Sequence, residues 1–328
     1  MLVIRVNGLA KSFKVAKRSS GLTEALKALF YRKHTIVQAL QDISFSIEPG
    51  EIVGYIGPNG AGKSTTIKVM SGILVPDQGT CEIMGFTPWK NRANYVKNIG
   101  VVFGQRSQLW WDVPVIDSFE LLKDIYKVSY HDYQENLTML IDLLNLKDII
   151  HTPVRQLSLG QRMRCEIAAS LIHNPKILFL DEPTIGLDAV SKIAVRKFIQ
   201  DYAKEKKVTV VLTTHDMSDI EALATRIILI GKGQLFYDGS VTTLRESYGS
   251  QKILTIDYQK SNVELDTSLQ SLILSKTEER IILRVDTKTA NVSKIIGQLS
   301  SQVELIDVSI EAEPIEDIII KLYKEYQI

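Results

Sequence analysis

The octet GPNGAGKS at residues 57–64 constrains this chain more than any other stretch of its sequence. It fits the phosphate-loop pattern G-x-x-x-x-G-K-[ST], which requires a strand before it and a helix after it. The apolar run Ile52–Ile56 is typical of a buried strand, and residues 65–70 are typical of the start of a helix. The sequence therefore predicts a strand–loop–helix unit that binds phosphate groups.

The residue types in this loop suit a polyphosphate. Glycine lacks a Cβ atom, so the chain can wrap closely around phosphate groups and present its backbone N–H groups to them. Lys63 supplies a positive charge to the outer phosphates, and the Ser64 hydroxyl is a ligand for Mg²⁺. The residues expected to contact the nucleotide are Gly57, Pro58, Asn59, Gly60, Ala61, Gly62, Lys63, Ser64 and Thr65.

Composition limits the class of protein. The 328 residues suffice for two or three domains. Lys+Arg is 39 and Asp+Glu is 38, a balance that gives no whole-chain positive field, so we expect no nucleic-acid partner. Two scattered cysteines, Cys81 and Cys165, indicate neither a disulfide framework nor a metal site and fit a reducing cytosol. No apolar run reaches about 18 residues, so work at a membrane would require a tether.

Short apolar segments alternate with longer periodic ones up to about residue 230, which predicts an α/β core. Between Phe103 and Ile177 the strand pattern is replaced by three helical segments, so we expect a helical block inserted into the core. Gly231-Lys232-Gly233 predicts a hairpin. The expected strands are Ile52–Ile56, Ile99–Phe103 and residues 177–180, 208–213 and 226–230, and the expected helices are residues 116–128, 133–146 and 160–173.

The pattern changes after about residue 240, with a predicted linker at residues 248–252. Beyond it we expect strands at residues 253–258, 280–285 and 303–310 and helices at 288–299 and 314–326. This is a small α+β domain over residues 241–328 without a phosphate loop. A purely stabilising role and a regulatory or dimerising role both remain open for it.

A basic insertion is expected at about residues 15–37. Leu22, Leu26, Leu29 and Phe30 share one face of a predicted helix in a segment rich in lysine and arginine. Such a helix can lie against an anionic membrane or a membrane protein. The alternative is a surface helix packed on its own domain.

Two adjacent acids, Asp181 and Glu182, follow the apolar run at residues 177–180. Asp181, at the end of a strand, can hold the Mg²⁺ shell in a phosphate-loop protein. Glu182 can orient and deprotonate a water molecule.

Residues 157–161, LSLGQ, open the third predicted helix of the inserted block. Ser158 and Gln161 form a capping-box pattern. A helix N-terminus with Ser158 and Gly160 is also an anion site, and it could hold the γ-phosphate of a nucleotide bound to another subunit.

Together these motifs resemble the ATPases of ATP-binding cassette (ABC) transporters over residues 1–240. The octet with Thr65 resembles the Walker A loop, LSLGQ the signature motif, and ILFLDEP at 177–183 the Walker B strand. GLD at 186–188 resembles the D-loop. The residues that this resemblance adds are Gln105 as the Q-loop glutamine, His215 as the switch histidine, Asp188 in the D-loop and Phe13 as the adenine-stacking aromatic.

The resemblance implies a phosphate-loop NTPase fold: a RecA-like core, an antiparallel β subdomain and a helical subdomain at about residues 105–172. It implies that two copies, identical or paralogous, close face to face around two ATP molecules with Mg²⁺. Glu182, His215 and Gln105 would be catalytic, and Gln105 would also contact Mg²⁺. The third signature position is Leu159 where the family usually has glycine, and leucine is strained at positive φ.

Residues 65–86 and the C-terminal extension resemble ATPases of type-two ABC exporters, which work with separate integral membrane permeases. Residues 101–126 resemble a bacterial subgroup that includes viologen and multidrug exporters. The adjacent pair Trp110 and Trp111 is expected either to anchor a docking permease helix or to pack in the core. These features imply a peripheral protein at the cytoplasmic face of the membrane. An importer ATPase, a non-transport ABC ATPase and a non-hydrolysing regulator remain alternatives.

Overall fold

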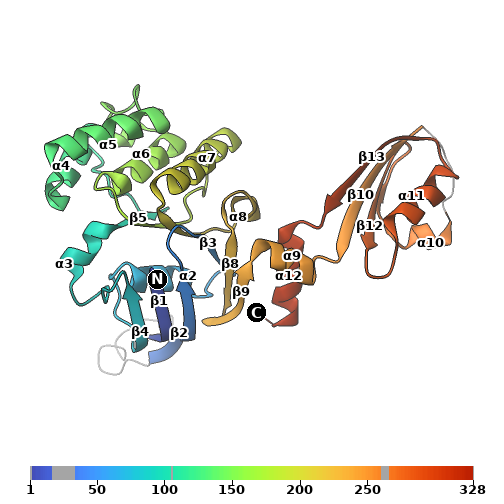
Figure 1. Ribbon diagram of the computed structural model, residues 1–328, viewed down its shortest axis with the longest axis horizontal. Coiled ribbons are helices and arrows are strands. Elements are labelled where there is room, and N and C mark those ends of the chain that lie inside the picture. Colours follow the sequence, from blue (N-terminus) through green and yellow to red (C-terminus); the bar gives the residue numbers. More distant parts are fainter. Residues whose placement is uncertain (1, 17–33, 105, 260–265, 328) are drawn as a thin grey trace, which may run out of the picture. The chain divides into compact units, whose positions relative to one another are not determined.

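The structure is a computed structural model that describes residues 2–16, 34–104, 106–259 and 266–327 (Figure 1). The chain divides into two compact units, Met1–Gly239 and Ser240–Ile328. The expected basic helix at residues 22–34 lies almost entirely outside the described residues, and so does Gln105. In the part of the chain that is described, no helix is long and apolar enough to cross a bilayer.

A six-stranded sheet forms the centre of the first unit, in the order β5-β6-β7-β3-β8-β9. The first five of these strands are parallel and nearly continuous in apolar residues, as expected for strands covered on both faces. Every predicted core strand is present within one residue of its expected bounds. The strands are β3 (Ile52–Ile56), β5 (Ile99–Phe103), β6 (Ile177–Asp181), β7 (Thr209–Thr213), β8 (Arg226–Gly231) and β9 (Gln234–Ser240).

Parallel strands need crossover connections, and helices supply them here. α2 (Lys63–Met70) follows β3, α7 (Ala189–Lys206) joins β6 to β7, and α8 (Met217–Leu223) joins β7 to β8. The predicted hairpin between β8 and β9 turns through Lys232 and Gly233, at φ 46° and 79°.

An antiparallel sheet in the order β2-β1-β4 completes this unit, with β1 at Ile4–Ala16, β2 at His34–Ile47 and β4 at Gln78–Ile83. The expected insertion at residues 15–37 is wrong at both ends, because Ala16 pairs with His34 and both belong to strands. The inward side chains of this sheet, such as Val6 and Ile43, share one core with Tyr55 and Ile67.

The three predicted helices of the inserted block are present as α4 (Val115–Tyr126), α5 (Tyr130–Leu143) and α6 (Leu159–Leu171). Ser129 caps α5 by accepting a hydrogen bond from the backbone N–H of Asp132 at 3.1 Å. In the view of Figure 1, this block and the antiparallel sheet lie at opposite ends of the first unit. The short helix α3 (Arg92–Tyr95) precedes β5.

The second unit contains a βαββαβ arrangement with sheet order β11-β12-β10-β13 and antiparallel neighbours, which is the ferredoxin-like topology. Its core lies between the sheet and one helical layer, where Leu254 and Leu283 pack with Leu299. The elements are α9 (Val241–Tyr248), β10 (Gln251–Tyr258), α10 (Thr267–Gln270), β11 (Ile273–Lys276), β12 (Arg280–Asp286), α11 (Val292–Ser300), β13 (Leu305–Ala312) and α12 (Ile315–Glu325).

The predicted linker at residues 248–252 is too long. Tyr248 ends α9, and Gln251 already pairs with Asp286 in the sheet. Only Gly249 and Ser250 remain between the two elements.

His173, between α6 and β6, should make the stability of the first unit depend on pH. Its Nε2 atom lies 2.8 Å from the backbone oxygen of Ile99, its ring stacks on Tyr126, and burial lowers its pKa to about 4. The unfolded chain takes up a proton below about pH 6.5 and the folded chain does not, so stability is lost as the pH falls from there towards 4.

We expect the free energy of unfolding to fall by about 3 kcal/mol over this range through His173 alone. Denaturant titrations at several pH values measure it. His173→Gln should remove this component, whereas the exposed His131, substituted in the same way, should leave it in place. Identical pH profiles for wild type and His173→Gln would contradict the prediction.

Candidate functional site

The phosphate loop lies between β3 and α2 and depends on three glycines for different reasons. Gly60 and Gly62 have φ of 82° and 108°, which other residues adopt only with strain. A Cβ atom on Gly57 would lie 2.2 Å from the backbone oxygen of Ile230 in β8. The loop is therefore held against the neighbouring strand, and a Cβ atom on Gly60 would meet nothing within 4 Å.

The N-terminus of α2 fits an anion. No side chain caps it, and its first turn contains no acidic residue. The first backbone N–H groups of a helix lack partners within the helix and carry its positive dipole end. An anion such as a phosphate group can satisfy them.

Lys63 adds a positive charge inside the loop. Its Nζ donates hydrogen bonds to the backbone oxygens of Gly57, at 2.6 Å, and Pro58, at 3.1 Å. Burial lowers the pKa of Lys63, while the nearby charges of Glu182 and Asp181 oppose that change. The ammonium group can exchange these carbonyl oxygens for phosphate oxygens.

Two of the three residues expected to hold Mg²⁺ lie together. The Ser64 Oγ atom is 3.4 Å from Asp181 Oδ1, and Thr213 donates a hydrogen bond to the same Oδ1 at 2.6 Å. A hydroxyl and a carboxylate at this spacing fit the oxygen ligation that Mg²⁺ prefers. The third expected ligand, Gln105, lies outside the described residues.

Glu182 lies one residue beyond β6, and its side chain Oε1 contacts His215 Nε2. The structure thus brings together the two residues that the sequence places 33 positions apart. Glu182 has a left-handed φ of 58°, and its backbone N–H donates to the Thr213 oxygen at 2.9 Å. Such a conformation is uncommon outside glycine and often accompanies functional sites.

Sequence reasoning missed Gly104. A Cβ atom there would lie 2.4 Å from the backbone oxygen of Glu182, and the Gly104 N–H donates to the Asp181 oxygen at 2.8 Å. Its place directly before Gln105 was the only available signal.

Sequence reasoning also missed two cations, Lys68 and Arg106. Both line a hollow of about 250 Å³ that is otherwise bounded by Ser64, Ile73, Phe103, Gly104, Asp181 and Glu182.

The start of α6 carries the predicted capping box. The Gln161 N–H donates to Ser158 Oγ at 3.2 Å, and the Ser158 N–H donates to Gln161 Oε1 at 2.9 Å. Leu159 is the first helical residue and is not among the residues with positive φ, so the expected backbone strain is not present. A Cβ atom on Gly160 would lie 2.5 Å from Ser191 Oγ, so α6 and α7 approach closely here.

Asp188 caps α7. It accepts hydrogen bonds from the backbone N–H of Ser191 at 2.9 Å and from its hydroxyl at 3.0 Å, and these bonds lower the pKa of Asp188. The side chain of Leu159 lies 2.8 Å from where a Cβ atom of Gly186 would be. LSLGQ and GLD are therefore neighbours within one chain.

Phe13 lies on β1 opposite Val37 of β2, with 36% of its surface exposed. Two residues after Val37, the backbone oxygen of Ala39 lies 2.5 Å from where a Cβ atom of Gly62 would be. β2 therefore contacts the phosphate loop, and the exposed ring of Phe13 lies on its neighbour, β1.

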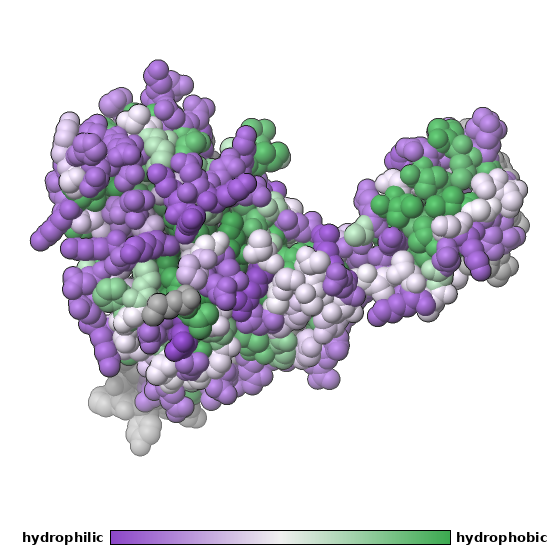
Figure 2. Space-filling model, viewed as in Figure 1, coloured by the Kyte–Doolittle hydropathy of each residue, from purple (hydrophilic) through white to green (hydrophobic). Residues whose placement is uncertain are grey.

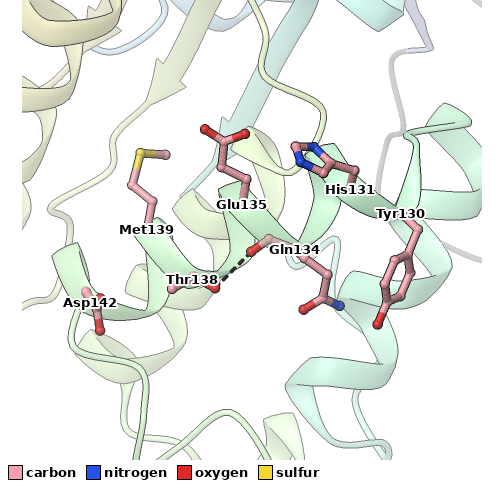
Figure 3. A pocket seen from close by; sticks show the side chains of 7 residues that line it. All are labelled: Tyr130, His131, Gln134, Glu135, Thr138, Met139 and Asp142. Atoms are coloured by element: carbon pink, nitrogen blue, oxygen red, sulfur yellow. Dashed lines mark hydrogen bonds between the residues drawn. The ribbon is translucent and has the colours of Figure 1, made fainter.

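A shallow hollow on α5 does not form a second site. Figure 3 shows that its lining side chains all project from this single helix. The lining residues are Tyr130, His131, Gln134, Glu135, Thr138, Met139 and Asp142.

Comparison with known proteins adds to this geometry. The family model described as "ABC transporter" matches residues 40–185. The ABC transporter ATP-binding protein NatA of Bacillus subtilis (strain 168) is 34% identical over 68% of this chain and 91% of that protein. The linearmycin resistance ATP-binding protein LnrL of the same organism is 27% identical over 89% of this chain and 94% of that protein.

Among solved structures, the dimeric post-hydrolysis structure of the ATP-binding cassette MJ0796 bound to ADP and Pi superposes with a TM-score of 0.61 at 25% identity. It covers 73% of this chain and 98% of that chain. The predicted phosphate-loop NTPase fold is confirmed by this likeness and by the parallel sheet.

Gly104→Ala should lower ATPase activity at least tenfold, because a Cβ atom would displace Glu182 by contact with its backbone oxygen. Steady-state turnover and the thermal unfolding midpoint should be measured together. Gly297→Ala is the matched control, because a Cβ atom there meets nothing within 4 Å. Full turnover of Gly104→Ala would show that the close approach is not required.

Proposed function

We propose that this chain, which belongs to the ABC transporter ATP-binding family, is the ATP-hydrolysing subunit of an exporter whose permease is a separate membrane protein. Members of this family are ATPases with a role in ATP-driven transport. The observation that carries the proposal is the meeting of the open phosphate loop, Asp181 and the Glu182–His215 pair at one edge of the parallel sheet.

For nucleotide binding, we assign the phosphates to the N-terminus of α2 and to Lys63, and the adenine ring to Phe13. Ser64, Asp181 and Gln105 are the proposed ligands of Mg²⁺, which when bound neutralises developing phosphate charge. The exposed ring of Phe13 and the uncapped helix end support these roles.

For hydrolysis, we assign Glu182 as the base that accepts a proton from the attacking water. A positioned base of this kind typically contributes about 10²- to 10⁴-fold in rate. We assign His215, which contacts Glu182, two roles: to fix the direction of the carboxylate and to hold the γ-phosphate.

A second copy, identical or paralogous, is proposed to complete the site with its α6 N-terminus. There the N–H of Gln161 is already bound by Ser158, which leaves the N–H groups of Leu159 and Gly160 for a γ-phosphate. Asp188, at the adjoining GLD turn, would contact the opposite copy. Because nucleotide then contributes binding energy only in the closed pair, it shifts the population towards closure.

The proposed docking surface for the permease contains Trp110 and Trp111, which are 42% and 51% exposed. The preceding loop is tied to α6 through the buried Glu166, which accepts hydrogen bonds from the Ser107 hydroxyl and, at 3.1 Å, from the Gln108 N–H. Burial raises the pKa of Glu166. A displacement of this loop by the permease can therefore be transmitted to α6, the helix that LSLGQ opens.

The likeness to LnrL supports export, because LnrL is named for resistance to linearmycin. This likeness extends through most of the second unit. We assign the second unit an accessory, regulatory role. Exposed Leu274, Ile306 and Ile310 contribute apolar surface to it, and Figure 2 shows a hydrophobic area on this unit.

We propose that the protein lies at the cytoplasmic face of the membrane, where the permease holds it. We propose no nucleic-acid partner.

Glu182→Gln should trap an ATP-bound dimer, because the amide keeps the size of the side chain but cannot accept the proton. Size-exclusion chromatography with light scattering, with and without ATP and Mg²⁺, measures the dimer. Turnover should fall at least 100-fold. Turnover near that of wild type would remove Glu182 as the base.

Replacing Trp110 and Trp111 with serine should abolish co-purification with integral membrane proteins from solubilised membranes, because exposed aromatic anchors dominate such contacts. Leu143→Ser is the matched control, an exposed apolar side chain on α5 in the same helical block. Undiminished recovery of the same membrane proteins with the double variant would place the docking surface elsewhere.

A further inference from the structure

Asp219 in α8 is a fully buried carboxylate outside every motif that the sequence identifies. Its Oδ2 atom accepts hydrogen bonds from the Thr184 hydroxyl at 2.5 Å and the Thr214 hydroxyl at 2.7 Å. Its Oδ1 atom accepts a hydrogen bond from Arg196 Nε at 2.5 Å. A buried charge is tolerated only with such compensation, so all three donors matter to it.

The three donors come from three segments that end at the proposed site. Thr184 lies two residues after Glu182, and Thr214 directly precedes His215. Arg196 lies on α7, the helix that Asp188 caps. One carboxylate therefore joins the segments that carry the base, the histidine and the GLD turn.

The chemistry of the cluster requires an acid at position 219. Thr214 Oγ1 already accepts the backbone N–H of Asp216 at 3.0 Å, so its own proton is directed at Asp219. Arg196 can only donate. An asparagine would turn an NH₂ group towards one of these donors and leave that contact unmade.

Further ion pairs strengthen the link between α7 and α8. Asp216 pairs with Lys192 at 2.5 Å and with Arg196 at 3.3 Å. These contacts fix the two helices to each other on the partly exposed side, whereas the side chain of Asp219 joins the two threonines. The ion pairs therefore hold α7 against α8, and the buried carboxylate of Asp219 holds the segments that contain Thr184 and Thr214.

We propose that Asp219 is a positioning residue for hydrolysis, which holds the Glu182–His215 pair in contact through Thr184 and Thr214. The proposal rests on the proposed roles of Glu182 and His215. A shift of the two segments relative to each other would separate the base from the histidine while leaving the phosphate loop on β3 and α2 unchanged. Loss of Asp219 should thus affect the rate of hydrolysis more than the binding of ATP.

The test uses the full-length chain purified together with its membrane partner. Asp219→Asn should lower kcat by about 10- to 100-fold, as expected for misplacement of reacting groups. KM and the affinity for a fluorescent ATP analogue should change less than about threefold, since uniform binding is kept. Asp238→Asn, which breaks the ion pair with Arg226 on the strand pair β8–β9, should leave both constants unchanged.

A double-mutant cycle with His215→Ala separates positioning from mere stabilisation. If Asp219 acts through the pair, Asp219→Asn should cost little further rate once His215 is gone. If His215→Ala lowers the rate, and the double variant loses the product of the two single-variant factors, the positioning role is overturned. If His215→Ala alone leaves the rate unchanged, the proposed role of His215 fails instead.

Thr214 supplies a milder variant if Asp219→Asn does not fold. Thr214→Val removes one hydroxyl at nearly constant volume and should lower kcat with little change in KM. Thr214→Ser restores the hydroxyl and should recover most of the loss. Equal kcat for the valine and serine variants would contradict the proposal.

Discussion

The site depends on the register of β6 between β5 and β7. Asp181 pairs with Phe103 on one side and with Thr213 on the other. This register brings the two acids to the same sheet edge as Ser64 and His215. Because side chains alternate along a strand, a slip of one residue would turn Asp181 to the opposite face and remove it from Ser64. A slip that moved Asp181 into the position of the buried Leu180 would also bury its charge, which is costly.

Near this strand end, the chain contains three local features that lower the stability of the fold. α2 has an uncapped N-terminus, Glu182 has a left-handed backbone, and Asp219 is a buried charge. Each is typical of a site kept ready for a ligand or a reaction rather than optimised for stability. The large apolar core that joins both sheets of the first unit offsets them.

Much of this arrangement could be predicted from sequence because its signals are local. Parallel strands are continuous apolar runs, and the phosphate loop and the capping box each occupy a few consecutive residues. β2 was not predicted, because its outer end, with Ile36 and Val37 exposed, follows a basic segment with helical spacing. α7 was missed because exposed Val190 and Ile193 interrupt its amphipathic pattern.

The rest could not be predicted because it depends on contacts between distant segments. Gly104 is required by the backbone of Glu182, and Asp219 by hydroxyls on two other loops. In the second unit β10, β12 and β13 were predicted individually and β11 was missed, and the order β11-β12-β10-β13 arises from non-local pairing. Leu159 shows the converse, since the expected strain disappears once it is the first residue of a helix.

The central claim is that ATP is held between the phosphate loop of one copy and the α6 N-terminus of another. Cross-linking tests it most directly, with one chain carrying Asn59→Cys and a second, separately tagged chain carrying Leu159→Cys. The native Cys81 and Cys165 are buried and should not interfere. The account predicts a covalent pair of the two chains only with Mg²⁺ and a non-hydrolysable ATP analogue. Equal cross-linking with and without nucleotide, or none at all, would contradict it.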